Sequence, residues 1–303
     1  MSHGRVCRRC LNYAGMRFFL NPRHVPARIL AHLALDEDGV CSVCRAYARE
    51  RVEPLHAALA QHVRERLHHG EPALVLCSGG KDSVATSALV RGLSAGPVVG
   101  FLYDNGFIPA AVVERAAVTL EQLGVPLLVG RPQEPARRAF ASLVLAPDPS
   151  APPPCEACAQ AMVLEALHEV DALEATLLIT GSNYWAAWTD QPLPAVGLRT
   201  PGGRDVLLVH LPYLLGRTRA DTLDLLGEFG FAPAQMAGVS SNCRVPALVQ
   251  ERVSQDVGHV PELEDLSLEV LVGHLTRAEA IRELYAKAPA QRRLLDGLFG
   301  GER

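Results

Sequence analysis

Seven of the eight cysteines in this 303-residue sequence fall into two groups whose spacing suits metal or thiol chemistry. The first group is two pairs, Cys7 with Cys10 and Cys41 with Cys44, each separated by two residues. Four thiolates from two tight turns can close a tetrahedral metal site without a vacancy, the usual arrangement of structural zinc. Four unrelated thiols are the alternative, but two such pairs in a short segment without regular periodicity favour a zinc site.

The second group is Cys155, Cys158 and Cys243. Three thiolates leave one coordination position open, which lets a bound metal or cluster hold a reactant. Thiolates are soft ligands that suit an iron–sulfur cluster or zinc. Two other interpretations stay open. One is a redox-active thiol pair in which Cys243 carries a persulfide; the other is a pair at a helix start that has no chemical role.

A glycine turn from Ser78 to Ser83, with the sequence SGGKDS, lies between an apolar run and a helical pattern. Glycines bring bare backbone N–H groups close to an anion, the helix N-terminus adds partial positive charge, and Lys81 adds a full one. The turn therefore predicts phosphate binding, with an ordinary strand-to-helix turn as the alternative. It is not a Walker loop, because Val75 and Asp82 stand where that motif has glycine and Ser or Thr. Cys77, just before the turn, is expected to be a small buried core residue.

The chain around these residues alternates apolar runs with helical patterns. The runs expected to be buried strands cover residues 73–77, 97–103, 125–130, 175–180 and 206–211. The patterns expected to be helices cover 82–92, 109–123, 156–170 and 218–229. This alternation predicts an α/β fold, a doubly wound parallel sheet with helices on both faces. Ligands on such sheets bind at the carboxyl ends of the strands, where the SGGKDS turn falls.

The flanking segments suggest three domains: a zinc-binding module over 1–50, a phosphate-loop domain over 51–235 and a small helical subdomain over 236–303. A helix over 54–69 is expected to join the first two, and residues 276–287 carry a helical pattern near the C-terminus. The proline-rich stretch 146–154 predicts a loop that delivers Cys155 to the site.

Composition and charge limit the class of protein. With 49% hydrophobic and 20% charged residues the chain is an ordinary globular protein, and its net charge of −4 argues against a general nucleic-acid coat. The basic residues before the first acid, Asp36, include Arg5, Arg8, Arg9, Arg17, Arg23 and Arg28. This basic segment either contacts RNA backbone or is simply solvated.

The first residues, MSHGRVCRRCLNYAG, lack the apolar core of a signal peptide, and no apolar run reaches the ~18–20 residues that cross a bilayer. We therefore expect a cytoplasmic protein without membrane contacts. In that reducing compartment cysteines are more naturally metal ligands or reactive thiols than disulfides.

The SGGKDS turn resembles the signature of the PP-loop (N-type) ATP pyrophosphatases, and YDNGF (103–107) and TGSN (180–183) resemble two further segments of that family. The resemblance implies an adenine nucleotide α-hydrolase-like sheet, cleavage of ATP between the α- and β-phosphates, and transfer of AMP to a substrate oxygen. It implies that Ser78 to Ser83 grip pyrophosphate and that Asp104 helps to bind Mg²⁺. The remaining nucleotide-binding residues that it implies are Gly181 and Asn183.

The cysteines extend this resemblance. DEDGVCSVC (36–44) is similar to the metal knuckle before the PP-loop in tRNA-thiolation enzymes and N-acetyl-sugar amidotransferases. The later three cysteines resemble those that hold a [4Fe-4S] cluster in thiolation enzymes, where the fourth iron takes the sulfur to be transferred. The resemblance thus implies an ATP-dependent sulfurtransferase that receives sulfur from a donor and acts on tRNA or a small molecule. Its catalytic residues would be Lys81, Asp82, Cys155, Cys158 and Cys243, with ATP, Mg²⁺, Zn²⁺ and the cluster as cofactors.

Two other functions stay open. The segment SNCRVPALV (241–249) is similar to the N-acetyl-sugar amidotransferases, which would require ammonia from a partner glutaminase. Alternatively, the chain is a metal-organised RNA-binding protein whose nucleotide loop only senses ATP.

Trp185 and Trp188 would stack on a base or ring, or pack as core or lid residues. The resemblance also implies a homodimer.

Overall fold

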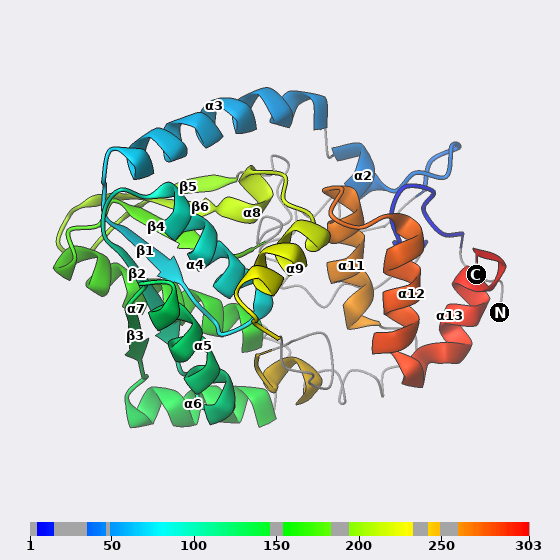
Figure 1. Cartoon of the computed structure of the whole chain (residues 1–303). Coiled ribbons are helices and arrows are strands. Elements are labelled where there is room, and N and C mark those ends of the chain that lie inside the picture. The colour runs from blue at the N-terminus through cyan, green and yellow to red at the C-terminus, as the bar shows by residue number, and fades with distance from the viewer. Residues whose placement is uncertain are drawn as a thin grey trace.

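The computed structural model describes residues 5–14, 35–46, 49–145, 154–182, 194–232, 242–248 and 260–302 (Figure 1). Its centre is a six-stranded sheet of order β3-β2-β1-β4-β6-β5. The strands are β1 (Ala73–Leu76), β2 (Val98–Tyr103), β3 (Leu127–Gly130), β4 (Leu177–Thr180), β5 (Ala195–Arg199) and β6 (Asp205–His210). All neighbours pair in parallel except β5 and β6. The predicted doubly wound parallel sheet and its five strands are therefore confirmed, and the structure adds one antiparallel strand, β5.

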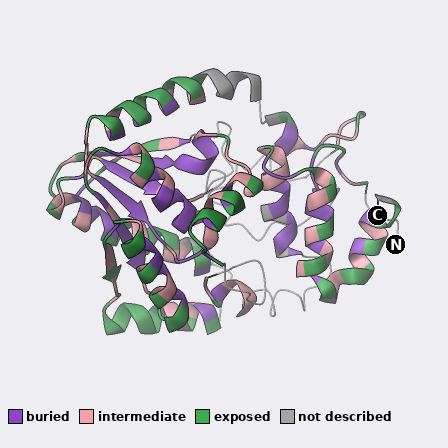
Figure 2. Cartoon of the chain, viewed as in Figure 1, coloured by how far each residue is buried: buried purple, intermediate pink, exposed green. Residues whose placement is uncertain are grey.

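Side chains of the central strands alternate between two hydrophobic cores. Val75 and Ile179 point to the core formed with helices α3 (Arg49–His68), α4 (Lys81–Leu93) and α9 (Arg219–Glu228). Leu74 and Leu178 point to the opposite core, which α7 (Pro154–Ala172) covers. Because both faces are covered, these strands are buried over most of their length, as the purple centre of Figure 2 shows.

The helices predicted from the sequence are confirmed, with ends shifted by a few residues. Further helices include α2 (Ser42–Ala46), α5 (Ala110–Gln122), α6 (Glu134–Leu145), α8 (Leu211–Leu214), α11 (Pro261–Leu271), α12 (Arg277–Lys287) and α13 (Arg292–Phe299). Two short 3₁₀ helices, Pro289–Gln291 and Gly300–Glu302, flank α13. Helix α6 was not predicted, and it lies mostly exposed with Val144 as its buried residue.

Strand β5 was not predicted either. It is an edge strand whose residues are largely exposed, so its sequence lacks the continuous apolar run of its neighbours. Pairing with β6 and an anchored turn hold it in place. The Asp171 carboxylate on α7 accepts hydrogen bonds from the Thr200 hydroxyl and from the Gly202 N–H, the latter at 2.7 Å.

The N-terminal segment packs on the C-terminal helices. Leu11 and Tyr13 belong to the same hydrophobic cluster as Leu284 of α12 and Phe299 of α13. The Arg277 guanidinium at the start of α12 donates a hydrogen bond to the backbone carbonyl of Cys10. Figure 1 shows residues 5–14, in dark blue, beside these helices. The two segments assigned from the sequence to separate domains thus share one core.

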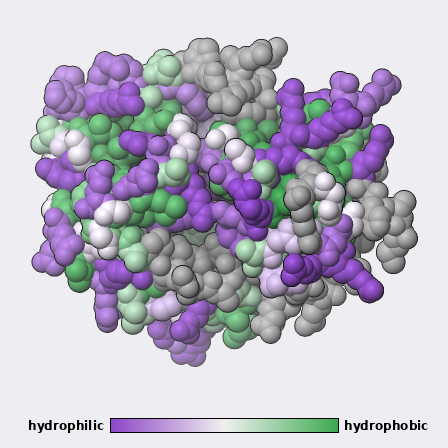
Figure 3. All heavy atoms as spheres, turned by 45° about the vertical axis from the view of Figure 1, so that its right-hand side comes forward, coloured by the Kyte–Doolittle hydropathy of each residue, from purple (hydrophilic) through white to green (hydrophobic). Residues whose placement is uncertain are grey.

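The residues predicted to form a proline-rich loop, 146–154, lie outside the described residues except Pro154, which begins α7. In the part of the chain that the structure describes, no helix is both long and apolar enough for a membrane span. On the face seen in Figure 3, hydrophilic and hydrophobic areas alternate without one side dominating.

Candidate nucleotide and thiol site

The SGGKDS turn joins β1 to α4 at the carboxyl edge of the sheet. Gly79 has a φ of +75°, in the left-handed region that side chains disfavour. A Cβ atom on Gly79 would also lie 2.8 Å from Cγ1 of Val112 on α5. Gly80 is the N-cap of α4 in an extended conformation, so the first turn of the helix opens directly onto the loop. Backbone N–H groups at such a helix start can bind phosphate.

The buried Ser83 hydroxyl holds the loop closed. Its Oγ accepts a hydrogen bond from the Ser78 N–H at 3.1 Å and donates one to the Gly80 carbonyl at 3.0 Å. The Ser78 hydroxyl lies 3.3 Å from the same oxygen. The serine that ends the motif therefore fixes two residues that precede it, and hydrogen bonds within the motif shape the loop.

Lys81 and Asp82 stand at the beginning of α4. The Lys81 ammonium lies 2.7 and 2.6 Å from the two carboxylate oxygens of Asp82, and both side chains are partly exposed. A cation and a carboxylate are therefore available at the phosphate loop. The first can contact a phosphate, and the second is a ligand type that Mg²⁺ accepts.

The loop after β4 lies directly against the first turn of α4. A Cβ atom on Gly181 would lie 2.8 Å from the Cα of Ser83 and 2.9 Å from the carbonyl carbon of Asp82. Glycine is thus required at this contact with the start of α4, and the predicted role of Gly181 in nucleotide binding stays a prediction. The other residues proposed after β4, namely Asn183, Trp185 and Trp188, lie outside the described residues.

Asp104 and Asn105 follow β2 at the same edge of the sheet. The Asp104 carboxylate accepts hydrogen bonds from the Gly106 N–H at 3.1 Å and from the Arg131 Nε at 3.2 Å. The Arg131 side chain is 73% exposed, so this ion pair is open to solvent and weak. Carboxylate oxygens are ligands that Mg²⁺ accepts. The predicted role of Asp104 in Mg²⁺ binding stays a prediction.

The structure brings two of the three later cysteines together. The Asn105 Nδ2 donates hydrogen bonds to Sγ of Cys158 at 3.2 Å and to Sγ of Cys243 at 3.7 Å. Cys158 is partly buried, and burial raises the pKa of its thiol while the bond from Asn105 opposes that rise. Cys155 lies one turn earlier on α7 and is exposed. Among the described residues, the four N-terminal cysteines form the only group of three or more possible ligands whose ligand atoms all lie within 4.8 Å of one another. The sulfurs of Cys155, Cys158 and Cys243 therefore do not all meet this distance.

Asn242 and Arg244 fix the segment that carries Cys243. The Asn242 Nδ2 donates a hydrogen bond to the Ser78 carbonyl at 2.9 Å. The Arg244 N–H donates one to the Phe107 carbonyl at 3.2 Å. Cys243 therefore lies between the phosphate loop and the extension of β2. Sequence reasoning missed Asn105 and Asn242. The available signal was their position next to Asp104 and Cys243.

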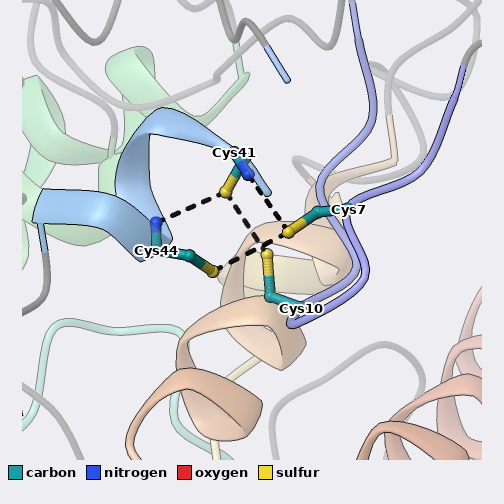
Figure 4. Close-up of side chains that lie close together, drawn as sticks. All are labelled: Cys7, Cys10, Cys41 and Cys44. Carbon is teal, nitrogen blue, oxygen red and sulfur yellow. Dashed lines mark hydrogen bonds between the residues drawn. The ribbon is translucent and has the colours of Figure 1, made fainter. Parts of the chain in front are cut away.

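The four N-terminal cysteines form one buried cluster (Figure 4). The Cys7 and Cys44 sulfurs are 3.9 Å apart, and the Cys10 and Cys41 sulfurs are 3.7 Å apart. Four sulfurs at the Zn–S distance in a tetrahedron stand about 3.8 Å apart, so the donor set and its spacing fit zinc. Backbone N–H groups also point at the sulfurs, among them that of Cys41, 3.3 Å from Sγ of Cys7. The predicted grouping of these four residues is confirmed, and zinc as the metal is a proposal.

Crowding of the sulfurs makes this cluster acidic in part. The hydrogen bond with Cys10, supported by those with Cys41 and Cys44, holds the pKa of the Cys7 thiol far below its ordinary value. The pKa of Cys10 is raised by its hydrogen bond with Cys41 and by burial. The four sulfurs thus compete for the same protons, and a cation that replaces those protons would relieve the competition.

Cys77 is the remaining cysteine. It is fully buried in the core beneath the phosphate loop, with its sulfur 3.8 Å from the Ser83 hydroxyl, and burial raises the pKa of its thiol. Its predicted role as a core residue is confirmed.

Comparisons with known proteins concern the fold. No family model matches the sequence, and no curated protein matches it. The chain is similar to the structure of NMN synthetase from Francisella tularensis, with 13% identity, a TM-score of 0.40, and coverage of 79% of this chain and 95% of that one. It is also similar to phosphoadenylyl-sulfate (PAPS) reductase from Candida auris in a phosphate complex, with 15% identity and a TM-score of 0.38. That similarity covers 61% of this chain and 89% of the reductase.

Proposed function

We propose that this protein is an ATP-dependent sulfurtransferase that adenylates an oxygen of its acceptor and replaces that oxygen with sulfur. The observation that carries the proposal is the bond from Asn242 to the Ser78 carbonyl, because it places Cys243 beside the phosphate loop. A loop suited to phosphate and a pair of thiols thus meet at one edge of the sheet, where α/β proteins bind ligands.

The first step would take place at the phosphate loop. Backbone N–H groups at the start of α4 and the Lys81 ammonium would hold the β- and γ-phosphates of ATP. They would also stabilise the charge that develops on pyrophosphate as the acceptor oxygen attacks the α-phosphorus. Asp82 and Asp104 would supply oxygens for Mg²⁺, each exchanging its present cation partner, Lys81 or Arg131, for the metal.

The second step would use the cysteines. Sulfur would attack the activated carbon, the carbon–oxygen bond would break, and the oxygen would leave with AMP. Cys158 and Cys243 already share Asn105, while Cys155 lies one helical turn away on the same side of α7, since residues three apart are neighbours on a helix. This arrangement fits a [4Fe-4S] cluster, because each cysteine binds a different iron and the sulfurs need not touch. When bound, the cluster would supply an open iron site that holds the sulfur.

The acceptor that we propose to test first is tRNA, because Arg5, Arg8 and Arg9 are exposed beside the four-cysteine cluster. Basic side chains of this kind bind the phosphate backbone of nucleic acids. Under this proposal the protein works in the reducing cytoplasm, where its thiols stay reduced.

The decisive experiment is anaerobic purification followed by measurement of zinc, iron and acid-labile sulfide per chain. The same preparation is then assayed for AMP release with ATP, sulfide and bulk tRNA, and the tRNA is digested and scanned for thionucleosides by mass spectrometry. We expect about one zinc and about four irons per chain, and AMP release that disappears in Lys81→Ala. Cys158→Ser and Cys243→Ser should lose iron and thionucleosides while they still bind ATP.

Other results separate the alternatives. Thionucleosides formed by iron-free protein would assign the sulfur step to the thiols of Cys158 and Cys243 alone. AMP release that requires ammonia instead of sulfide would identify an amidotransferase. tRNA binding without any AMP release would identify an RNA-binding protein that senses ATP. Each of the last two results would overturn sulfur transfer.

A further inference from the structure

Asn105 is a buried polar residue at the point where three distant segments meet. Its side chain is in contact with Cys158 on α7 and with Cys243 in the segment 242–248, and 4% of the residue is exposed. A buried amide costs free energy unless its donors and acceptors are used. The bonds that Asn105 makes are therefore informative about what the site is built to hold.

The orientation of this amide is determined by its own neighbourhood. Its Oδ1 accepts a hydrogen bond from the Phe107 N–H at 2.8 Å. A backbone N–H can only donate, so the oxygen must face Phe107, and the amino group must face the opposite way. That side is where the two sulfurs lie. The donors of Asn105 are thus aimed at Cys158 and Cys243 by the backbone of the loop that carries it.

The segment that carries Cys243 is also held by the backbone of Phe107. Phe107, whose N–H orients Asn105, also accepts the hydrogen bond from the Arg244 N–H through its carbonyl. The same backbone residue therefore positions both the amide and the residue after Cys243. Cys155, in contrast, has an exposed side chain at the start of α7.

We propose that Asn105 is a positioning residue that holds Cys158 and Cys243 as one two-thiol unit, with Cys155 outside it. This is a different grouping from the one that the spacing of Cys155 and Cys158 suggests. Only the use of this unit in the sulfur step rests on the proposed function. The unit itself can be tested without ATP or acceptor.

The test is cross-linking of the full-length, reduced protein, free of any cluster, with dibromobimane, in which each of two thiols displaces one bromide as HBr. The reagent fluoresces once both bromides are displaced, and peptide mass spectrometry then identifies the two cysteines that it joins. We expect the main product at this site to join Cys158 to Cys243. In Asn105→Asp, which keeps the acceptor for Phe107 and removes the donor, that product should form about fivefold more slowly.

Three controls make the outcome specific. Cys243→Ser should abolish the product, and Cys155→Ser should leave it unchanged. Single alkylation by monobromobimane should be measured at Cys158 and at Cys243, so that a loss of thiol reactivity is not mistaken for a loss of proximity. Unaltered labelling of Cys155 together with unaltered retention of zinc would show that the variant is folded.

A product in the unsubstituted protein that mainly joins Cys155 to Cys158 would overturn the proposal, even if the Asn105→Asp variant could not be purified. Equal cross-linking rates in the unsubstituted protein and the folded Asn105→Asp variant would overturn the role of Asn105. If the cross-link forms as expected but no sulfur is transferred, the proposed function fails and the two-thiol unit stands.

Discussion

The side-chain amide of Asn242 donates a hydrogen bond to the backbone carbonyl of Ser78 across 164 positions of sequence. This bond joins the residue before Cys243 to the first residue of the phosphate loop. The bonds that shape the loop internally run from Ser83 to Ser78 and Gly80, so the Asn242 amide is an attachment from outside it. The position of the loop and the position of Cys243 are therefore coupled.

Replacement of Asn242 by Ala should weaken ATP binding as well as thiol chemistry. The variant loses one hydrogen bond to a partly buried carbonyl, which corresponds to about 1 kcal/mol or about a fivefold change in affinity. Isothermal titration with ATP and Mg²⁺ measures this change. A variant of exposed Arg138, Arg138→Ala, is the control and should bind ATP normally. An Asn242→Ala protein with unchanged affinity would show that the two positions are independent.

Gly181→Ala should damage both the stability and the nucleotide site. The added methyl group would lie within 2.9 Å of backbone atoms at the start of α4, and backbone cannot move aside as a side chain can. We expect a loss of about 1–3 kcal/mol of unfolding free energy together with weaker ATP binding. Gly197→Ala is the matched control, because nothing lies within 4 Å of its added Cβ. Urea unfolding of the two variants should differ clearly; equal midpoints would contradict the contact.

Removal of metal from the four-cysteine cluster should loosen both ends of the chain. The cluster packs against Leu268 of α11 and Tyr213 of α8, and the adjoining residues Leu11 and Tyr13 pack on α12 and α13. We expect Cys10→Ser to lose zinc and to lower the melting temperature by about 10 °C or more, since structural zinc contributes several kcal/mol to folding.

Limited proteolysis gives the location of this effect. The C-terminal helices α11–α13 should be cleaved first in Cys10→Ser or after treatment with a strong chelator. Cys155→Ser, which changes an exposed cysteine outside the cluster, should keep its zinc and its resistance. Cleavage restricted to the N-terminal segment would show that the cluster does not support the C-terminal helices.

His210 should make stability fall in mild acid. It lies 7% exposed at the end of β6, and burial lowers the pKa of its imidazole to about 4. The ordinary value in an unfolded chain is about 6.5, so between these values the unfolded chain binds more protons than the folded one. The contribution of neutral His210 to the free energy of unfolding is fully present above pH ~6.5. It is lost as the pH falls toward 4, by about 3 kcal/mol in total.

Urea unfolding at pH 7 and pH 5 tests this prediction. Several carboxyl groups, including Asp171 and Glu71, have lowered pKa values and lose their own contribution as pH falls. They act mainly below the range of this comparison, because their ordinary values are near 4. The stability of His210→Leu should therefore change less than that of the unsubstituted protein between pH 7 and 5. Parallel pH dependence in the two proteins would show that His210 does not carry the effect.

The sequence predicted those parts of the site that are local in the chain. Buried parallel strands appear as continuous apolar runs, and the SGGKDS turn contains within six residues the glycines, the lysine and the serine that shape it. Likewise, each pair of N-terminal cysteines lies on a single turn. Such features need no knowledge of the fold.

The features that were not predicted depend on contacts between distant segments. Asn105 bonds to cysteines 53 and 138 positions away, and neither asparagine nor cysteine spacing indicates this. The exposed helix α6 and the edge strand β5 lack the apolar periodicity that identifies buried elements. The link that Asn105 makes between Cys158 and Cys243 is also a property of the fold, because the sequence shows only the proximity of Cys155 to Cys158.

The packing of residues 5–14 on the C-terminal helices has a consequence for synthesis of the protein. A ribosome releases the first cysteine pair well before it releases α12 and α13, whose apolar surface covers Leu11 and Tyr13. Metal capture by the nascent cysteines can therefore come before their burial, and the packing of this segment awaits synthesis of these two helices.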